Sequence, residues 1–383
     1  MLDTNILAFC LAQFLLAWGL RNTSVSSYAR ILIVLLIIPC SLYSVRGSWV
    51  KQFPSGVGAE YVIGFILHAN SFLNLGKLEP DKTWSNAKKT IWAINSSVGA
   101  RWEAGFVPAF KKKDPAYIPT RWSLLLERLW GVCWTLSIIW LIRKYRIQAT
   151  PDDFLSVPND FLLRLGEVSY REAVIRIQYS IGGYTMQYMS LRACHSLLTC
   201  IALLLGQGPE QWPPLFGSLR EAYTVRRFYA LFWHRLMRKA FTSHAAAFCC
   251  NILRMPRNSQ ITRFFIIAGA FMISAIMHTF AAPGLERCGF WPQCRYYISI
   301  ILAIALEDVV FGVSKRVMKL ASPASKTKSK DASRKVAKAY QGSQEDEEGP
   351  SMVLRTFGYA WTAGFHVWAG SMMIYGLWSG CSA

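Results

Sequence analysis

The residues FFIIAGAFMISAIMHTFAA, Phe264–Ala282, form an uncharged apolar stretch that is long enough to cross a bilayer as a helix. One ionisable residue, His278, lies inside it. Ionisable groups are rare at membrane depth because their desolvation is costly, so each is a candidate functional residue. Upstream, FYALFWHRLMR, Phe228–Arg238, combines aromatic residues with arginines and a second histidine, His234. The sequence therefore pairs an aromatic motif with a histidine inside a membrane span.

Apolar runs recur along the whole chain of 383 residues, and only 17% of the residues are charged, against about 25% in ordinary soluble domains. We expect membrane-spanning or membrane-associated helices at Leu2–Leu20, Ala29–Val45, Glu60–Leu75, Trp122–Ile142, Ala193–Leu205, Phe264–Ala282, Tyr296–Ser314 and Thr356–Trp378. The pattern predicts one all-α, polytopic domain over residues 1–383, with roughly eight transmembrane helices around a buried reaction chamber. Basic residues flank both ends of Trp122–Ile142, so charge leaves its orientation open. The adjacent glycines at 182 and 183 predict a break in the chain.

The formal net charge of +20 does not indicate a nucleic-acid-binding protein. The basic residues lie between apolar segments and in one polar tail, which is the placement expected of membrane-flanking positive charge. Residues 76–120 are therefore expected in the cytosol. Residues 321–350 are rich in Ser, Ala and Lys, and they are predicted to form a flexible polar cytosolic loop within the domain.

The ten cysteines do not form a disulfide scaffold in a chain of this length, because most of them lie in apolar runs. Cys288 and Cys294 fall between two spans, and they can pair if that loop is luminal. No cysteine or histidine group has the spacing of metal ligands, so no metal site is expected.

The motif Phe228–His234, FYALFWH, resembles the aromatic motif FYxxWWN of the membrane-bound O-acyltransferase superfamily, whose catalytic histidine lies in a later apolar helix. His234 stands where the broader superfamily has Asn, and the wax-synthase-like branch has WH there. NSSVGARWEAGFVP, Asn95–Pro108, is similar to that branch's pattern RGIGxxWxxKNIP, although its Lys-Asn is Gly-Phe here. The resemblance covers roughly residues 90–315, and the branch includes acetyltransferases of fungal terpenoid pathways.

This resemblance implies an O-acyltransferase that moves acetyl from acetyl-CoA to a hydroxyl of a lipophilic terpenoid in secondary metabolism. Its partners would be the acyl-CoA co-substrate, a lipophilic alcohol and membrane lipid, without nucleic acid or a permanently bound cofactor. It would be a multi-pass protein of the endoplasmic reticulum. A long-chain wax-ester activity is the alternative within the class. A proton-coupled transporter is the alternative outside it, although the halves of the chain show no internal repeat.

Transfer from a thioester to an alcohol needs a base for the hydroxyl proton and stabilisation of the oxyanion. We assign His278 as the general base, because neutral imidazole accepts a proton near physiological pH. His234 is assigned to the thioester carbonyl or to substrate orientation. The alternative for His278 is a structural histidine bonded to Ser274 or to a neighbouring carbonyl. His366 is a reserve candidate, His195 is read as structural, and a cysteine nucleophile at Cys249 or Cys250 lacks a neighbouring base.

The donor is expected to contact basic and aromatic residues of the motif, namely Arg227, Trp233, Arg235 and Arg238. On one continuous helix, Arg227, His234 and Arg238 would share a face. Arginine pairs well with phosphate, which favours contacts with coenzyme A. The same arginines also fit a cytosolic membrane border, and the two interpretations are compatible.

Overall fold

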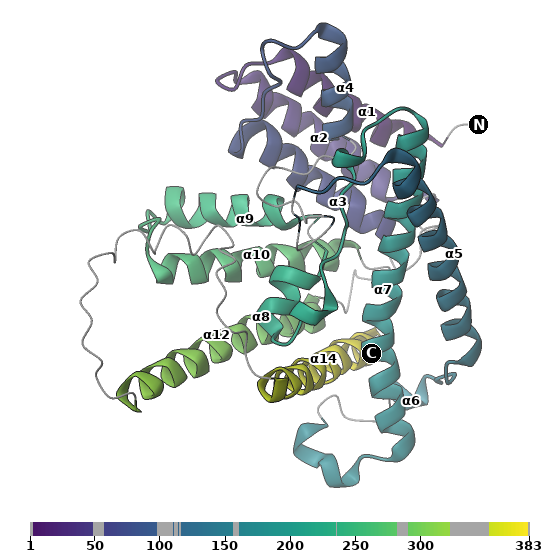
Figure 1. Ribbon diagram of the computed structural model, residues 1–383, viewed down its shortest axis with the longest axis vertical. Coiled ribbons are helices and arrows are strands. Elements are labelled where there is room, and N and C mark those ends of the chain that lie inside the picture. The colour runs from purple at the N-terminus through teal and green to yellow at the C-terminus, as the bar shows by residue number, and fades with distance from the viewer. Residues whose placement is uncertain are drawn as a thin grey trace.

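The computed structural model describes residues 3–48, 57–97, 110, 114, 116–155, 161–234, 236–281, 290–321 and 352–381. Within these ranges every regular element is a helix (Figure 1), which confirms the all-α class. Four helices of the described chain are long and apolar enough to cross a membrane: Thr4–Asn22, Arg121–Tyr145, Gln260–Phe280 and Phe290–Ser314. Ala29–Val45 is a shorter apolar helix. The predicted total of roughly eight spans is not confirmed.

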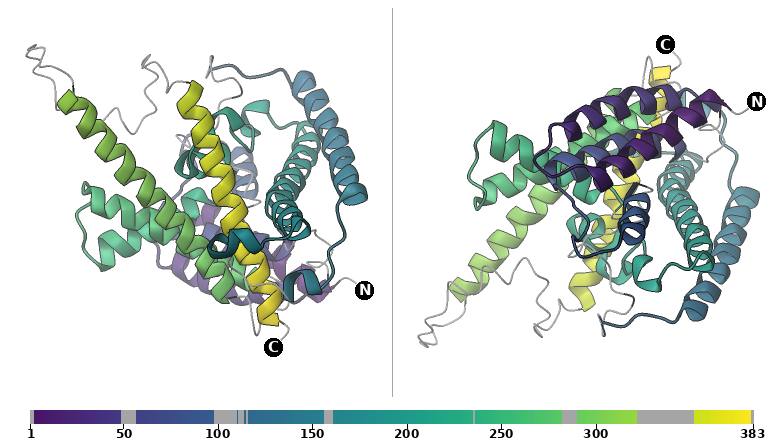
Figure 2. Two further views of the ribbon diagram at one scale, coloured as in Figure 1. Left: turned by 90° about the horizontal axis from the view of Figure 1, so that it is seen from below. Right: turned by 90° about the horizontal axis from the view of Figure 1, so that it is seen from above.

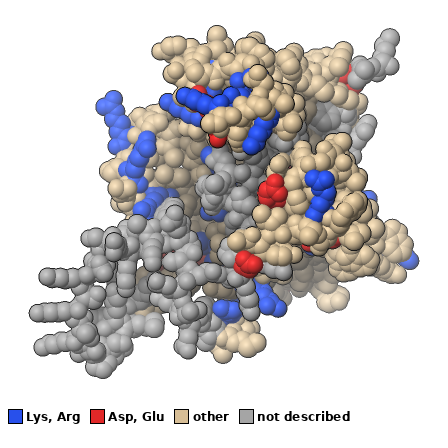
Figure 3. Space-filling view, turned by 45° about the horizontal axis from the view of Figure 1, so that its top comes forward, with Lys and Arg blue, Asp and Glu red and all other residues tan. Residues whose placement is uncertain are grey.

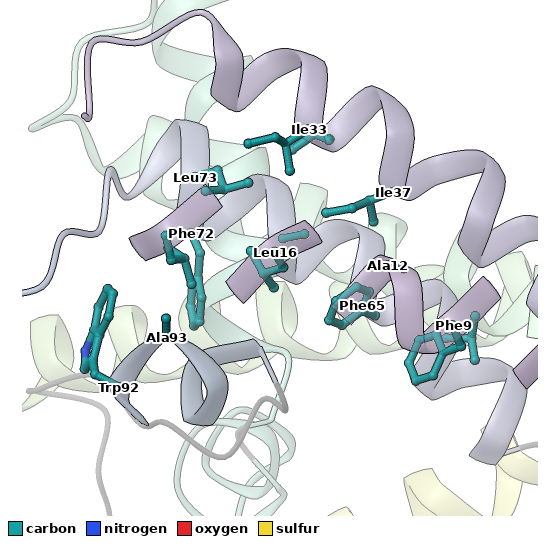
Figure 4. Close-up of a cluster of buried hydrophobic side chains, with 14 of the residues drawn as sticks. Phe9, Ala12, Leu16, Ile33, Ile37, Phe65, Phe72, Leu73, Trp92 and Ala93 are labelled. Carbon is teal, nitrogen blue, oxygen red and sulfur yellow. The ribbon is translucent and has the colours of Figure 1, made fainter. Parts of the chain in front are cut away.

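The N-terminal helices pack around one apolar core. They are α1 (Thr4–Asn22), α2 (Ala29–Val45), α3 (Val57–Asn70) with its π-helical continuation η3 (Ser71–Leu75), and α4 (Asn86–Ser97). Leu16, Ile37 and Phe65 meet in this core from α1, α2 and α3 (Figure 4). The core fixes one face of α3. The helix is also in contact with α9 and α10, so it connects the N-terminal helices to the rest of the protein.

The long helix α7 (Tyr170–Leu204) packs against α5 (Arg121–Tyr145) and also against α14 (Met352–Cys381). The short helices α6 (Asp152–Leu155) and η4 (Leu162–Glu167) lie between α5 and α7 in the chain. The break predicted at residues 182 and 183 is wrong, because α7 is continuous there. A glycine in a helix costs only about 1 kcal/mol, and α7 gains packing from both neighbours.

The aromatic motif, Phe228–His234, lies in the C-terminal half of the chain (Figures 1 and 2). The elements in and around the motif are η5 (Pro209–Gln211), η6 (Leu219–Glu221), α8 (Val225–Arg227), η7 (Phe228–Phe232), α9 (Arg238–Ala247) and η8 (Phe248–Ile252). The helix α10 (Gln260–Ala281) contacts α9 and η8, and α12 (Phe290–Ala321) contacts α8 and α14. Val225, Ala275, Ile300 and Phe365 share one buried cluster, one residue from each of α8, α10, α12 and α14. The motif is therefore held where these helices meet.

The outer surface is largely apolar or uncharged. The outward side chains of α5 include Trp122, Leu126 and Trp130, which are 69%, 66% and 73% exposed. Lys and Arg residues stand in separate groups among uncharged residues in Figure 3, and acidic residues are fewer there. Exposed apolar helices of this kind are suited to lipid, so the chain is an integral membrane protein.

Some sequence predictions fall outside the described residues. They concern Arg235, residues 322–350 and Cys288, the proposed partner of Cys294. The single-domain boundary of 1–383 also stays a prediction.

Candidate active site

The motif does not form the continuous helix expected from the sequence. The α-helical turn α8 passes into the π-helical turn η7, and the chain becomes extended at Trp233, where ψ is 155°. A new helix, α9, begins at Arg238. The prediction that Arg227, His234 and Arg238 share one helical face is therefore wrong. π-Helical turns are frequent at functional sites, and here the turn is followed directly by the segment that carries His234.

A loop that precedes the motif ends this helix by direct backbone contact. The amide of Gly217 donates a hydrogen bond of 2.9 Å to the carbonyl oxygen of Phe232. The two backbones approach so closely that a Cβ on Gly217 would stand 1.8 Å from the carbonyl oxygen of Leu231. Only glycine fits this contact. The loop thus fixes the position of the chain immediately before Trp233 and His234.

A buried carboxylate holds the other end of the motif. Glu307 of α12 is 6% exposed, and its Oε1 and Oε2 accept hydrogen bonds from the amides of Val225 and Arg226 at 2.6 and 2.9 Å. The indole Nε1 of Trp361 donates to Oε1 at 2.8 Å. A carboxylate at the first turn of a helix satisfies otherwise unpaired amides and is favoured by the helix dipole. Glu307 therefore ties the motif to both α12 and α14.

Aromatic rings pack against one another along the motif. Trp233 stacks on Phe228 with ring centroids 5.4 Å apart, and its edge meets Tyr184 of α7 at 5.6 Å. Phe216, from the loop before the motif, contacts both Trp233 and His234 at 5.7 and 5.9 Å. This packing places Trp233 beside His234.

His278 forms a hydrogen bond with a carboxylate from a distant helix. Its Nδ1 lies 2.7 Å from Oε1 of Glu60 on α3, a residue 218 positions earlier in the chain. Because an ionised carboxylate only accepts, Nδ1 of the imidazole donates to Glu60, and in the neutral ring this leaves Nε2 with a lone pair. The ring of Tyr297 stacks on the imidazole at 5.7 Å. Both side chains of the pair are about one-fifth exposed, at 19% for His278 and 20% for Glu60, so the pair is not sealed from a substrate.

His234 lies close enough to His278 and Glu60 for their charges to act on its imidazole. The pKa of His234 is lowered to about 4, first by burial and then by the charge interaction with His278, while Glu60 opposes the shift. His234 is therefore neutral near physiological pH. Its Nδ1 is buried and has no hydrogen-bond partner in the described structure. The fold thus brings together the two histidines that the sequence assigned, with a carboxylate that it did not.

The other two candidate histidines have different environments. His366 is 3% exposed, its Nδ1 donates to the carbonyl of Thr362 at 2.7 Å, and its ring lies 4.3 Å from that of Phe228. The reserve candidate therefore borders the motif without joining the pair of His278 and Glu60. His195 is buried on α7 and its ring contacts Trp212 at 5.8 Å.

Two of the arginines predicted to bind the donor form hydrogen bonds or ion pairs with residues in or next to the motif. Arg227 forms an ion pair with Glu221 and also donates to the Glu221 carbonyl at 3.1 Å. Arg238 donates to the carbonyl of Ala230 at 3.0 Å. In this structure both side chains support the fold of the motif. Whether they also contact phosphate stays a prediction.

Sequence reasoning assigned no role to Glu60, did not connect Glu307 with the motif, and missed the close contact at Gly217. Each carboxylate lies in a predicted apolar segment, and a charged group in such a segment is the signal that could have singled it out. In the described residues no group of three potential metal ligands gathers.

Comparison with known proteins gives a family match over the motif and α10. Residues 212–295, which include His234 and His278, match the model of the membrane bound O-acyl transferase family. The chain is 29% identical over 245 residues to acetyltransferase aurG of Calcarisporium arbuscula, covering 61% of this chain and 57% of the relative. It is 27% identical to acetyltransferase TRI7 of Fusarium sporotrichioides, covering 66% and 63%. It is 47% identical over 114 residues to acetyltransferase ataH of Aspergillus terreus, covering 28% and 36%.

The apolar helices define an integral membrane protein, and His234, His278 and Glu60 form its candidate polar site. The match over the motif and α10 confirms the resemblance to the membrane bound O-acyl transferase family that was seen in the sequence. The matches span between 36% and 63% of the length of these three relatives.

Proposed function

We propose that the protein is an O-acetyltransferase that moves acetyl from acetyl-CoA to a hydroxyl of a lipophilic, terpenoid-type alcohol in secondary metabolism. The observation that carries the proposal is the contact of His278 with Glu60 beside His234. Both histidines lie inside the segment that matches the family. The relatives named above are acetyltransferases, which favours acetyl over a long-chain donor and favours an enzyme over a transporter.

In the proposed reaction, Nε2 of His278 removes the proton of the acceptor hydroxyl. The oxygen attacks the thioester carbonyl carbon, the tetrahedral intermediate collapses, and the C–S bond breaks. The departing thiolate of coenzyme A receives the proton from the imidazolium. Glu60 holds Nδ1, fixes the orientation of the ring and stabilises the positive charge that forms on it. No covalent acyl-enzyme is needed, because thiolate is a good leaving group.

His234 is assigned to the oxyanion. A neutral imidazole carries one N–H, and it can donate a hydrogen bond to the carbonyl oxygen without bringing a second positive charge next to His278. Burial keeps His234 neutral, which suits this role. Such a donor contributes typically about 10²–10³-fold to turnover.

The donor is expected to approach from the cytosol, where the basic segments lie, and the alcohol from the bilayer, into which it partitions. Contacts of Arg227, Trp233, Arg235 and Arg238 with coenzyme A remain part of the proposal. So do the endoplasmic reticulum as location and the absence of a permanently bound cofactor.

The test is acetyl transfer in membranes that contain the protein. Labelled acetyl-CoA is offered with a panel of hydroxylated terpenoids, and extracted lipids are analysed for acetate esters. The wild type and a His195→Asn control should form a labelled ester, whereas His278→Asn at matched abundance should not. If the folded wild type acetylates no member of a broad panel, or if His278→Asn matches the wild type, the proposal is wrong.

A further inference from the structure

Two methionines fill the space on α3 next to the pair of His278 and Glu60. Gly64 follows Glu60 by one helical turn and is buried. A Cβ placed on Gly64 would lie 3.1 and 3.2 Å from Cε and Sδ of Met237, and 3.5 Å from Sδ of Met277. Both thioethers therefore pack directly on the bare backbone of Gly64.

These methionines come from the two segments that carry the candidate histidines. Met277 immediately precedes His278 on α10 and is 5% exposed. Met237 follows His234 by three residues, at the start of α9. One turn along α3 from Glu60, which contacts His278, the surface is therefore covered by the apolar thioethers of Met237 and Met277.

We propose that Met237 and Met277 confine the acyl group of the donor to a short chain, with acetyl as the preferred group. This inference rests on the proposed function and adds the residues that set the donor length. The carbonyl carbon must lie within a few ångströms of Nε2 of His278, because the hydroxyl that this nitrogen deprotonates attacks it. The carbonyl oxygen requires a polar donor such as His234. The apolar acyl substituent is then best placed against the thioethers, and longer chains would have to displace them.

The experiment compares acetyl-CoA, butanoyl-CoA and octanoyl-CoA as donors, with an acceptor that the wild type acetylates. The measured quantity is the ratio of kcat/KM for acetyl to that for butanoyl. The wild type should favour acetyl by about ten-fold or more, since each methylene that fits or fails to fit is worth about 10–200-fold. Met237→Ala and Met277→Ala should each lower the ratio by about ten-fold. Gly64→Ala should raise it, because its methyl pushes the Met237 thioether into the site.

Met272→Ala is the matched control, since Met272 lies on α10 with Met277 and is not among the atoms nearest to a Cβ on Gly64. Its ratio should stay within two-fold of the wild type, about 0.4 kcal/mol at most. Elution from size exclusion in detergent checks folding, and Met→Val at both positions replaces any alanine variant that aggregates. Unchanged ratios in folded, active Met237 and Met277 variants would overturn this inference alone. A wild type that transfers no acyl group would overturn the proposed function and this inference with it.

Discussion

A methyl group added at Gly217 is expected to impair the proposed acetyl transfer without unfolding the protein. The new Cβ would stand 1.8 Å from the carbonyl oxygen and 2.9 Å from the carbonyl carbon of Leu231, and 3.3 Å from Cα of Phe232. These neighbours are backbone atoms, so no side chain can rotate away. Cβ atoms essentially never approach closer than 3.0 Å, so the two backbones must separate by about 1.2 Å.

That displacement acts on the segment that carries His234. It also breaks the hydrogen bond between the Gly217 amide and the Phe232 carbonyl, worth about 1 kcal/mol. A misplacement of about 1 Å in a catalytic group can cost about 10²-fold in rate. Gly217→Ala should therefore lower kcat/KM for acetyl transfer by about 10²-fold.

The assay is ester formation in membranes, normalised to protein that elutes as a single species in detergent. Gly183→Ala in α7 is the control, since a Cβ there meets nothing within 4 Å, and its activity should equal that of the wild type. A folded Gly217→Ala enzyme with more than a third of wild-type turnover would refute the argument that this contact positions the site.

Three further outcomes are expected. Glu307→Ala should lower the melting temperature in detergent more than Glu307→Gln. Alanine leaves the buried amides of Val225 and Arg226 unpaired, at about 1–3 kcal/mol each. Equal melting temperatures for the two variants would argue against the role of Glu307 at the motif. At saturating donor, His278→Asn should lower kcat by about 10²–10⁴-fold, whereas His234→Asn should be milder because an amide can still donate to the oxyanion; the reverse order would exchange the two roles. Replacing residues 322–350 by a short neutral linker should leave specific activity within a few-fold, since their composition cannot form a packed core, and a complete loss in a folded, membrane-inserted protein would show that they bind a substrate or partner.

The sequence by itself determined the helical membrane class and the two histidines. The helix that carries His278 was predictable because an uncharged run of this length has few other stable conformations in a bilayer, where each backbone amide must be bonded within its own helix. His278 was conspicuous within it for the same reason, since an ionisable side chain there is costly. The aromatic motif was recognisable from residue types at fixed spacing.

Only the tertiary structure decided how those residues are arranged. A helical pattern could not show that the motif breaks after Phe232, because the break depends on the backbone of Gly217 reaching it from a separate loop. Nor could it pair Glu60 with His278 across 218 positions. Local sequence governs which segments become helices, whereas the partner of each polar side chain depends on which distant helices pack together. In a membrane interior a buried charge needs such a partner, and the fold of the whole chain supplies it.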